Sequence, residues 1–337
     1  MSVSSPAASP VHGMSHGTAG AARALPVILA FAALAAFPHF AGAYETGLAM
    51  KIMILAIFAL SLELLVGQTG LVCFGHAAFF GIGAFTVTLL TPMSGPIPLW
   101  LALPASVGAA ALYALPVGAL SLRTRGIYFI MITLAFTQMA YFAFHDTPLG
   151  GGSDGIYLDF RPEAAIGSWQ PFDLGNDRTL YYAVLVTLVA VFGALAVMLR
   201  SRFGRALAGI RVNEQRMRAA GFPTYGYKLG AFVLSGAIAG LAGFLFALKD
   251  GYVNPEMLSW HHSGAVLLMI ILGGIGHLRG AMLGALVFTL LQEVYQSDAL
   301  LGDFARHWQL PLGLTIIACV ALMPRGLIGL FARARQA

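Results

Sequence analysis

The chain has 337 residues, of which 58% are hydrophobic and 10% are charged, and its formal net charge is +5. Soluble domains carry roughly 25% charged residues, so this composition excludes an ordinary soluble domain, a disordered chain and a nucleic-acid-binding protein. We therefore expect an integral membrane protein built from helices, because lipid cannot satisfy the backbone polar groups of irregular segments. The two cysteines, Cys73 and Cys319, lie in separate apolar runs and indicate no disulfide framework.

The apolar runs predict the membrane spans, since a helix that crosses a bilayer needs about 20 mostly apolar residues. Ten runs qualify, at residues 24–44, 47–66, 72–90, 98–122, 127–145, 180–199, 229–248, 264–276, 281–297 and 310–330. The eighth is short and interrupted by glycines, which indicates a broken or re-entrant segment. The expected fold is an all-α polytopic membrane protein with about ten transmembrane helices.

The polar segments divide the chain into parts. Residues 1–22 are rich in Ser, Pro, His and Gly and predict a flexible cytoplasmic tail without the features of a removable signal peptide. Residues 23–331 form the predicted transmembrane domain, and residues 332–337 form a second cytoplasmic tail. Two long polar excursions interrupt the transmembrane domain, an outer loop at 146–179 and an inner loop at 200–228.

The charges predict the orientation of the spans. With both termini in the cytoplasm, ten spans place 14 of the 19 basic residues on the inner side and 12 of the 14 acidic residues on the outer side. An excess of Lys and Arg on the cytoplasmic side is the usual arrangement in membrane proteins. The basic character of the chain is therefore explained by its sidedness and needs no nucleic-acid partner.

The inner loop has the pattern of an amphipathic helix. Its apolar residues recur at helical spacing: Phe203, Leu207, Ile210 and Met217. Its charged residues occupy the other faces: Arg205, Arg211, Glu214, Arg216 and Arg218. Gly221 can supply the left-handed turn that ends the helix, and Pro223 prevents its continuation. The helix either rests on anionic lipid or docks a cytoplasmic protein.

Residues 67–85 are rich in glycines that would allow an unwound entry followed by close helix packing: Gly67, Gly70, Gly75, Gly81 and Gly83. Residues 75–84 (GHAAFFGIGA) align with residues 276–285 (GHLRGAMLGA) at an offset of 201 positions, which indicates a weak internal repeat. Such paired breaks point to the substrate pathway of a transporter, although helix packing alone also explains them. His76 is either a ligand contact or a histidine with a satisfied hydrogen bond.

Other small and polar residues carry weaker predictions. Gly236 with Gly240, and Gly280 with Gly284, have the GxxxG spacing of packing notches. The adjacent pair His261 and His262 at an outer edge provides too few ligands for a metal site.

Several chemistries lack their motifs. No lysine follows a glycine, so the chain has no phosphate-binding Walker A loop, and no histidine is followed by glutamate, so it has no HExxH zinc helix. Ionisable residues are scarce in the spans: Glu63 and Lys51 lie near opposite ends of one helix, where each can snorkel to the interface. This scarcity argues against an ion-driven carrier, so energy for transport would come from another protein.

Five blocks of sequence occur in a characteristic order: GQTGLVCFGHAAFFGIGAF, LRTRGIYFIMITLAFTQM, GGSDGI, GRALAGIRVNEQRMRAAGFPTYGYKLGAFVLSGAIAGLAGFLFAL and ILGGIGHLRGAMLGAL. Together they resemble the LivM-type permeases of branched-chain amino-acid ABC importers over roughly residues 50–330. The resemblance implies a non-catalytic permease subunit in the bacterial inner membrane that carries branched-chain or similar neutral amino acids.

The resemblance also implies partners and a site. The partners would be a second related permease, two cytoplasmic ABC ATPases and a periplasmic substrate-binding protein. The ATPases would use ATP and Mg²⁺, and this chain would bind no cofactor or metal. The inner loop would be the ATPase-coupling loop, with Arg205, Ile210, Arg211, Glu214, Met217, Ala220 and Gly221 as its candidate residues. The translocation pathway would run near residues 67–85, 130–138 and 271–284, with Gly67, Gln68, Gly75, His76, Gly81, Gly83, Thr133, Gln138, Gly274 and Gly276 as candidates.

Alternative functions remain open from the sequence. Permeases of urea or amide ABC importers share much of the pattern, although GGSDG at 151–155 is more similar to the amino-acid branch. The pairs Gln68-Thr69 and Cys73-Phe74 depart from the residues common in the family and leave the solute open. A passive channel, a secondary carrier and a membrane enzyme that uses His76 or His261-His262 are the alternatives from other classes.

Overall fold

The computed structural model describes residues 29–92, 95–164, 172–297, 302–323 and 326–333. It separates into two units, one up to Gly42 and one from Ala43 onward. Within the first unit, residues 29–39 form a short apolar helix whose last turn is the 3₁₀ helix η1 (Phe37–His39). The predicted tail at 1–22 and most of the one at 332–337 lie outside the described residues.

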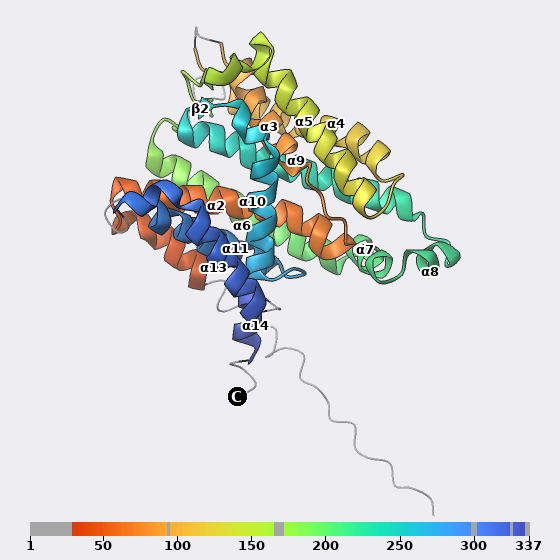
Figure 1. Cartoon of the computed structure of the whole chain (residues 1–337). Helices are drawn as coiled ribbons and strands as arrows, with labels where there is room; N and C mark the ends of the chain where they lie inside the picture. The colour runs from red at the N-terminus through yellow and green to blue at the C-terminus, as the bar shows by residue number, and fades with distance from the viewer. Residues whose placement is uncertain (1–28, 93–94, 165–171, 298–301, 324–325, 334–337) are drawn as a thin grey trace, which may run out of the picture. The chain divides into compact units, whose positions relative to one another are not determined.

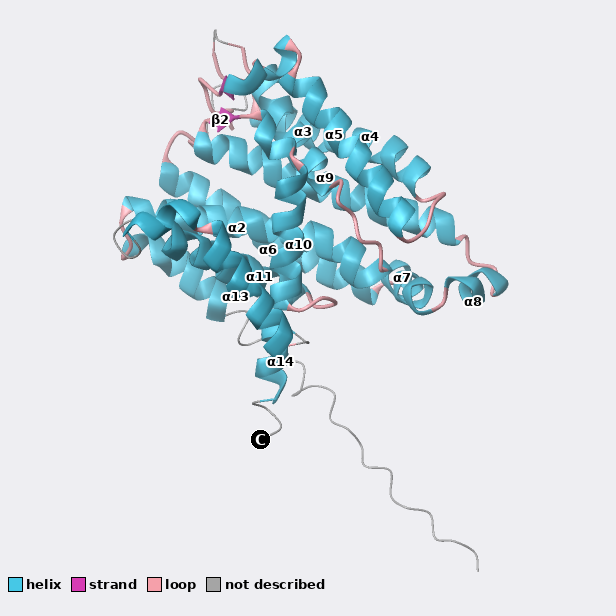
Figure 2. Cartoon of the chain, in the orientation of Figure 1, coloured by secondary structure: helices cyan, strands magenta, loops and turns pink. Residues whose placement is uncertain are grey.

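The second unit is built almost entirely from helices (Figures 1 and 2). They are α2 (Ala43–Glu63), α3 (His76–Leu90), α4 (Leu99–Ser121), α5 (Ile127–His145), α6 (Asp177–Arg200), α7 (Arg202–Val212), α8 (Glu214–Ala219), α9 (Thr224–Asp250), α10 (Trp260–Gly273), α11 (Leu278–Gln296), α13 (Gln309–Leu322) and α14 (Gly326–Arg333). Two short strands, β1 (Ile156–Tyr157) and β2 (Tyr252–Val253), pair antiparallel. The all-α class of the sequence analysis is confirmed.

The number of membrane spans differs from the expectation. Six helical segments among the described residues are long and apolar enough to cross a bilayer: Ala43–Thr69, Leu99–Ser121, Ile127–His145, Asp177–Arg200, Thr224–Asp250 and Gln309–Gly329. The pair α10 and α11, bent by 115°, makes a seventh if it counts as one span. The segments Leu29–His39 and His76–Leu90 are apolar but shorter. Ten spans are therefore not confirmed, because a glycine-rich break shortens several of the predicted segments.

Helix α9 is central to the packing of this unit and lies against α2, α3 and α4. Glycines allow these helices to approach closely. A Cβ atom on Gly243 would lie 1.8 Å from the Phe80 carbonyl oxygen of α3, and a Cβ atom on Gly240 would lie 2.3 Å from the Ala110 Cβ of α4. Gly236 meets Ala114 in the same way. The pair Gly236 and Gly240 thus forms a packing notch, as its spacing predicted.

Two helices are interrupted inside the apolar region. Helix α2 continues into the π-helical turn η2 (Leu64–Thr69), which ends at Gly70 with a φ of 74°. The chain then runs without helix until His76 opens α3. The second interruption separates α10 from α11, where Gly274 and Gly276 have φ values of 112° and 94°. The broken segment predicted at 264–276 is confirmed.

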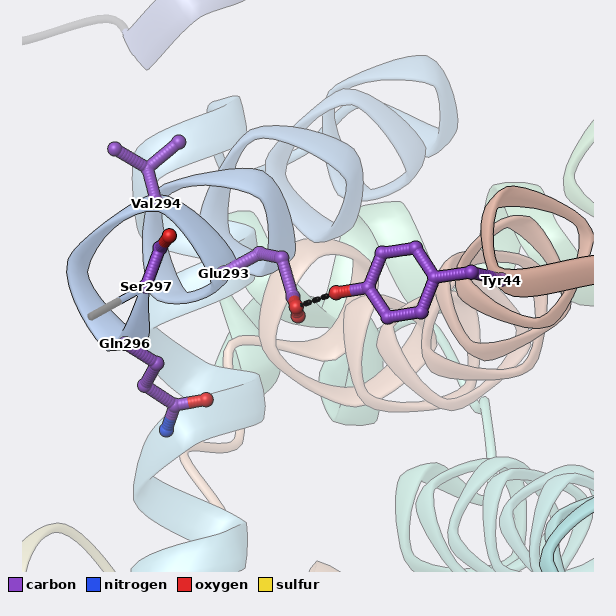
Figure 3. A pocket seen from close by; sticks show the side chains of 5 residues that line it. All are labelled: Tyr44, Glu293, Val294, Gln296 and Ser297. Atoms are coloured by element: carbon purple, nitrogen blue, oxygen red, sulfur yellow. Dashed lines mark hydrogen bonds between the residues drawn. The ribbon is translucent and has the colours of Figure 1, made fainter. Parts of the chain in front are cut away.

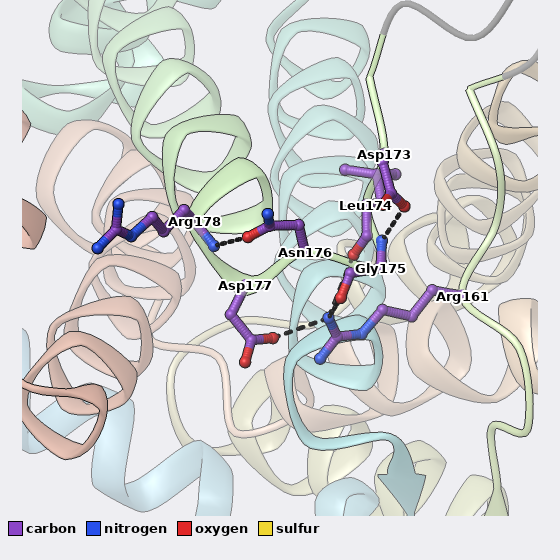
Figure 4. A network of polar contacts seen from close by, with 7 residues as sticks. All are labelled: Arg161, Asp173, Leu174, Gly175, Asn176, Asp177 and Arg178. Carbon is purple, nitrogen blue, oxygen red and sulfur yellow. Dashed lines mark hydrogen bonds and ion pairs between the residues drawn. The ribbon is translucent and has the colours of Figure 1, made fainter.

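The outer loop is held by one arginine (Figure 4). Arg161 Nη1 donates to the carbonyl oxygens of Leu174 and Gly175, each at 3.1 Å, and to Asp177 Oδ1 at 2.9 Å. Asn176 Oδ1 accepts from the Arg178 N–H at 2.9 Å and caps the start of α6. The loop folds back on β2 through β1, at the end of α9 opposite to α7 and α8 (Figure 1).

Candidate functional site

The two helix breaks meet at Glu63, the last residue of α2. The Gly276 N–H donates to Glu63 Oε1 at 2.7 Å, and Gln68 Nε2 donates to the Gly276 carbonyl oxygen at 3.5 Å. Each break lies where a segment of the predicted repeat begins. The non-helical stretch after η2 ends at Gly75, the first residue of 75–84, and the α10–α11 connection at 274–277 contains the first residues of 276–285. The structure therefore brings together the predicted pathway residues Gln68 and Gly276, which are 208 positions apart.

Glu63 is the main correction to the sequence analysis. The side chain does not snorkel to the interface, because its exposed fraction is 0%. Gly67 makes room for it, since a Cβ atom on Gly67 would lie 1.8 Å from Glu63 Oε1. A carboxylate buried at membrane depth is costly and usually has a function. Gly67, predicted as a pathway residue, is thus required by the acid one turn before it.

The inner loop reaches this cluster through Arg211 of α7. Arg211 Nη1 donates to the Gly67 carbonyl oxygen, and the same nitrogen lies 3.6 Å from the position that a Cβ atom would take on Gly276. The π-helical turn leaves carbonyl groups without the usual helical partner, and such turns are frequent at functional sites. One side chain thus joins the predicted coupling loop to the first break and lies close to the second.

The unwound stretch before α3 is anchored by threonines of α5. The Phe74 N–H donates to Thr133 Oγ1 at 3.3 Å, and Thr137 Oγ1 donates to the Phe74 carbonyl oxygen at 3.4 Å. Cys73 is fully buried and its sulfur accepts from the Gly75 N–H at 3.3 Å. Thr133 was predicted and Thr137 was missed, although threonines four residues apart on an apolar helix share a face and could have indicated the pair.

His76 lies in the core at the start of α3. Its Nε2 is 2.8 Å from Ser61 Oγ and 3.5 Å from Ser235 Oγ, and its ring stacks on Phe58 with centroids 5.5 Å apart. The Ala77 N–H, in the first turn of α3, has no acceptor within the helix and donates to Ser263 Oγ of α10 at 2.9 Å. Its Nε2 is thus satisfied within the protein, whereas its Nδ1 has no hydrogen-bond partner within the residues that the structure describes. Neither prediction for His76, a ligand contact or a histidine with a satisfied hydrogen bond, is decided by this surrounding.

The remaining pathway candidates occupy different environments. Gly81 and Gly83 are packing residues, since Cβ atoms on them would lie 2.4 Å from Leu258 Cγ and 2.1 Å from the Gly240 carbonyl oxygen. Gly75 and Gly274 are buried at the two breaks, and Gln138 is half-buried on α5. Their role in transport stays a prediction.

The inner loop folds as two helices, whereas the sequence analysis expected one. Asn213 is extended, with φ of −159° and ψ of 100°, and this ends α7. Its Oδ1 accepts from the Arg216 N–H at 2.8 Å and caps α8. The expected single helix is wrong because asparagine competes with the helix through its own side chain. The periodicity of the sequence could not reveal the break at Asn213, because the apolar residues of the two short helices keep helical spacing on both sides of it.

The end of α8 follows the prediction for Gly221. The residue has a φ of 83°, and its N–H donates to the Arg218 carbonyl oxygen at 2.9 Å. The next N–H, of Phe222, donates to the Met217 carbonyl oxygen at 3.1 Å. This pair of bonds is the Schellman arrangement, which requires a left-handed residue and therefore favours glycine.

Glu214 ties α8 to α9. Its Oε1 lies 2.9 Å from Lys228 Nζ and 2.5 Å from Arg218 Nη2, and it accepts from Thr224 Oγ1 at 3.2 Å. Partial burial raises the pKa of Glu214, but the hydrogen bonds and charges of Lys228 and Arg218 outweigh it, so the pKa lies below its ordinary value. Lys228 was missed because it lies beyond the amphipathic pattern, at the start of a membrane helix.

The candidates of the coupling loop differ in exposure. The exposed candidates are Arg205, Arg211, Arg216, Ala220 and Gly221; Glu214 and Met217 are half-buried, and Ile210 is buried. Val212 is 83% exposed although it is apolar. We define the docking face as the exposed residues Val212, Gln215, Arg216, Ala219 and Ala220 of this corner. It combines apolar and basic side chains, as a protein-binding surface does.

A shallow pocket lies elsewhere, at the start of α2 and the end of α11 (Figure 3). It is lined by Tyr44, Glu293, Val294, Gln296 and Ser297, and the Tyr44 hydroxyl donates to the Glu293 carboxylate. The pocket shares no residue with the predicted pathway.

Comparisons with known proteins connect this geometry to a family. Residues 45–320 match the family described as "Branched-chain amino acid transport system / permease component". The chain belongs to this permease family. No solved structure matches the chain.

Among relatives of this permease, the LivM protein of Escherichia coli is 31% identical over 87% of the chain and 72% of its own length. The LivH protein of the same organism and the BraD protein of Pseudomonas aeruginosa are each 25% identical over 81% of the chain and 91% of their lengths. All three are named as permease proteins of high-affinity branched-chain amino acid transport systems. LivM and LivH are both named as permease proteins of such a system in Escherichia coli.

Proposed function

We propose that the chain carries branched-chain or similar neutral amino acids across the bacterial inner membrane as one half of a permease pair. The importer would further contain two cytoplasmic ATPases, which use ATP and Mg²⁺, and a periplasmic substrate-binding protein. The solute is the one named for the relatives LivM, LivH and BraD. This chain would bind no cofactor and would perform no catalysis.

The observation that carries the proposal is the contact between Arg211 and the Gly67 carbonyl oxygen. It connects the corner of α7 and α8 to the breaks at 64–70 and 274–277. ATPases that close on the docking face would move this corner, and the breaks would let the helices rearrange around a pathway near residues 67–85, 130–138 and 271–284. The expected result is alternating access.

The proposed membrane arrangement follows from the charges and the broken segments. Both termini, residues 1–22 and 332–337, would be cytoplasmic tails around a transmembrane permease domain at 23–331. The shorter helices Leu29–His39 and His76–Leu90, and the bent pair α10–α11, would bring the segments that enter the bilayer to about ten.

The test of the proposal measures solute-stimulated ATPase activity of the reconstituted importer. In the Gly221→Val variant a β-branched residue meets a φ of 83°, and in Arg216→Glu the charge of the docking face is reversed. Both should lose most of the stimulation while the chain still inserts into the membrane. Arg125→Glu, which changes an exposed arginine before α5, is the control and should remain stimulated.

Unchanged stimulation in both variants would contradict docking at this corner. Uptake into vesicles that contain this chain alone, without ATP, would indicate a passive channel. Loss of uptake on collapse of an ion gradient would indicate a secondary carrier. Binding of urea instead of an amino acid by the cognate binding protein would move the chain to the urea branch.

A further inference from the structure

The buried carboxylate of Glu63 is only half satisfied. Its Oε1 accepts from the Gly276 N–H at 2.7 Å, whereas its Oε2 has no hydrogen-bond partner within the residues that the structure describes. The side chain has an exposed fraction of 0%. A buried acceptor without a partner is unfavourable and calls for an explanation. The explanation that we consider is a donor that reaches Glu63 Oε2 in another conformation of the protein.

Arg211 is placed to be that partner. Its guanidinium donates to the carbonyl oxygen of Gly67. The Glu63 carboxylate occupies the space that a Cβ atom on Gly67 would take. The guanidinium therefore lies beside the carboxylate but is bonded to the backbone next to it. Arginine has several donors in a planar fork that suits a carboxylate better than a single carbonyl. Exchange of one acceptor for the other needs only a small displacement.

The displacement has an evident origin in α7. Arg211 directly precedes Val212, an apolar residue of the docking face that is 83% exposed. The helix has 11 residues, ends at the extended Asn213 and is joined to α6 at Ser201. Helices at interfaces between subunits shift by about 1–2 Å in allosteric transitions. A force applied at the docking face thus acts on the guanidinium with few intervening groups.

We propose that Arg211 and Glu63 are positioning residues that couple the docking face to the pathway. In the state seen here, Arg211 holds the Gly67 carbonyl and Glu63 holds the Gly276 N–H. In the alternate state, Arg211 pairs with the Glu63 carboxylate, and the α10–α11 break separates from α2. The inference rests on the proposed function and names the contact through which it operates.

Both breaks depend on the same carboxylate. Gly67 lies in η2, which precedes the first copy of the repeat, and Gly276 opens the second copy. A rearrangement of Glu63 therefore acts on both copies at once. Independent anchoring of each break would not do this. The pair accounts for an acid that directly follows the largely apolar stretch 52–62 of α2.

The test uses the importer reconstituted in vesicles with its ATPases, second permease and binding protein. Arg211→Gln and Glu63→Gln should leave the importer assembled but lower the amount of amino acid imported per ATP by about tenfold. Arg211→Lys keeps the charge and a donor and should restore part of the loss. Arg202→Gln, an exposed arginine at the other end of α7, is the control and should match the wild type.

The double variant Glu63→Gln with Arg211→Gln decides whether the two residues act together. If the two residues act together, the amount imported per ATP should be no lower in the double variant than in either single variant, because the same interaction is lost in all three. Additive losses that follow the thermal stability of the complex would indicate a structural role and overturn the inference. Single variants that import like the wild type would also overturn it. Wild-type import that is independent of ATP would instead contradict the proposed function.

Discussion

Single polar side chains in this protein join one helical segment to another. Glu63 meets Gly276, Ser61 meets His76, and Glu214 meets Lys228. Each pair lies in or beside an apolar helix, where an unsatisfied polar group is costly. These residues therefore hold particular helices together. Loss of charge on one partner should therefore change the thermal stability of the protein.

Glu214 allows a test by pH. Its pKa is lower in the folded protein than in the unfolded chain, because Lys228 and Arg218 outweigh partial burial. The charge therefore stabilises the fold above the ordinary carboxyl pKa, and this contribution is lost as the pH falls through the lowered folded value. Glu214→Gln should unfold at a lower temperature than the wild type near neutral pH, and the difference should disappear in acid.

The measurement is the thermal midpoint of the purified permease across the pH range. Asp159→Asn, which removes an exposed carboxylate of the outer loop, is the matched control and should differ little from the wild type at any pH. A difference for Glu214→Gln that grows in acid would have the opposite sign and would contradict the ion-pair assignment.

At the scale of elements, close helix crossings depend on glycines. Helices α3 and α9 approach at Gly83 and Gly243, and helices α10 and α11 approach at Gly273 and Gly284. A Cβ atom at any of these four positions would lie about 2 Å from a backbone oxygen. Most glycines of the repeat thus serve packing, and the left-handed ones mark the breaks.

Gly243→Ala tests the crossing of α3 and α9. Its Cβ atom would lie 1.8 Å from the Phe80 carbonyl oxygen, so the helices must separate. Overpacking of this kind costs about 1–3 kcal/mol, and we expect a lower thermal midpoint in detergent. Gly193→Ala in α6, where nothing lies within 4 Å, is the control and should be neutral or slightly stabilising. Equal midpoints for the two variants would contradict the close crossing.

At the scale of the whole molecule, the inner and outer loops occupy opposite ends of α9, which has 27 residues (Figure 1). A helix of this length spans about 40 Å and is long enough to cross the bilayer. The distribution of Lys and Arg predicts that the α7–α8 corner faces the cytoplasm. The proposed contact with cytoplasmic ATPases requires this sidedness.

Labelling of single cysteines tests this orientation. Ser153→Cys lies in the outer loop and Gln215→Cys in the docking face, and both positions are exposed. With Cys73 and Cys319 replaced, a membrane-impermeant maleimide should label residue 153 in intact spheroplasts and residue 215 only in inverted vesicles. The reverse pattern would place the docking face outside and would rule out its contact with ATPases.

Much of this architecture could be predicted without coordinates. Hydropathy is a property of consecutive residues, so the apolar runs identified the helical class. The glycines indicated an interruption within 264–276 and a left-handed helix end at Gly221, because backbone freedom is a property of the glycine residue itself. The ordered motifs identified the family, which the match over residues 45–320 then showed.

The remaining features depend on contacts between segments far apart in the chain. Glu63 was expected at the interface but is buried. The N–H that donates to its carboxylate belongs to Gly276, which is 213 residues away in the sequence, so the sequence pattern could not reveal the contact. Arg211 was predicted as a residue of the coupling loop, but its bond to the carbonyl oxygen of Gly67, 144 residues away, was visible only in the structure. Periodicity and composition describe neighbours along the chain, whereas burial and hydrogen bonding are set by neighbours in space. Membrane class, helices and family could therefore be read from the order of residues, and the meeting of two helix breaks at one buried carboxylate required the folded arrangement.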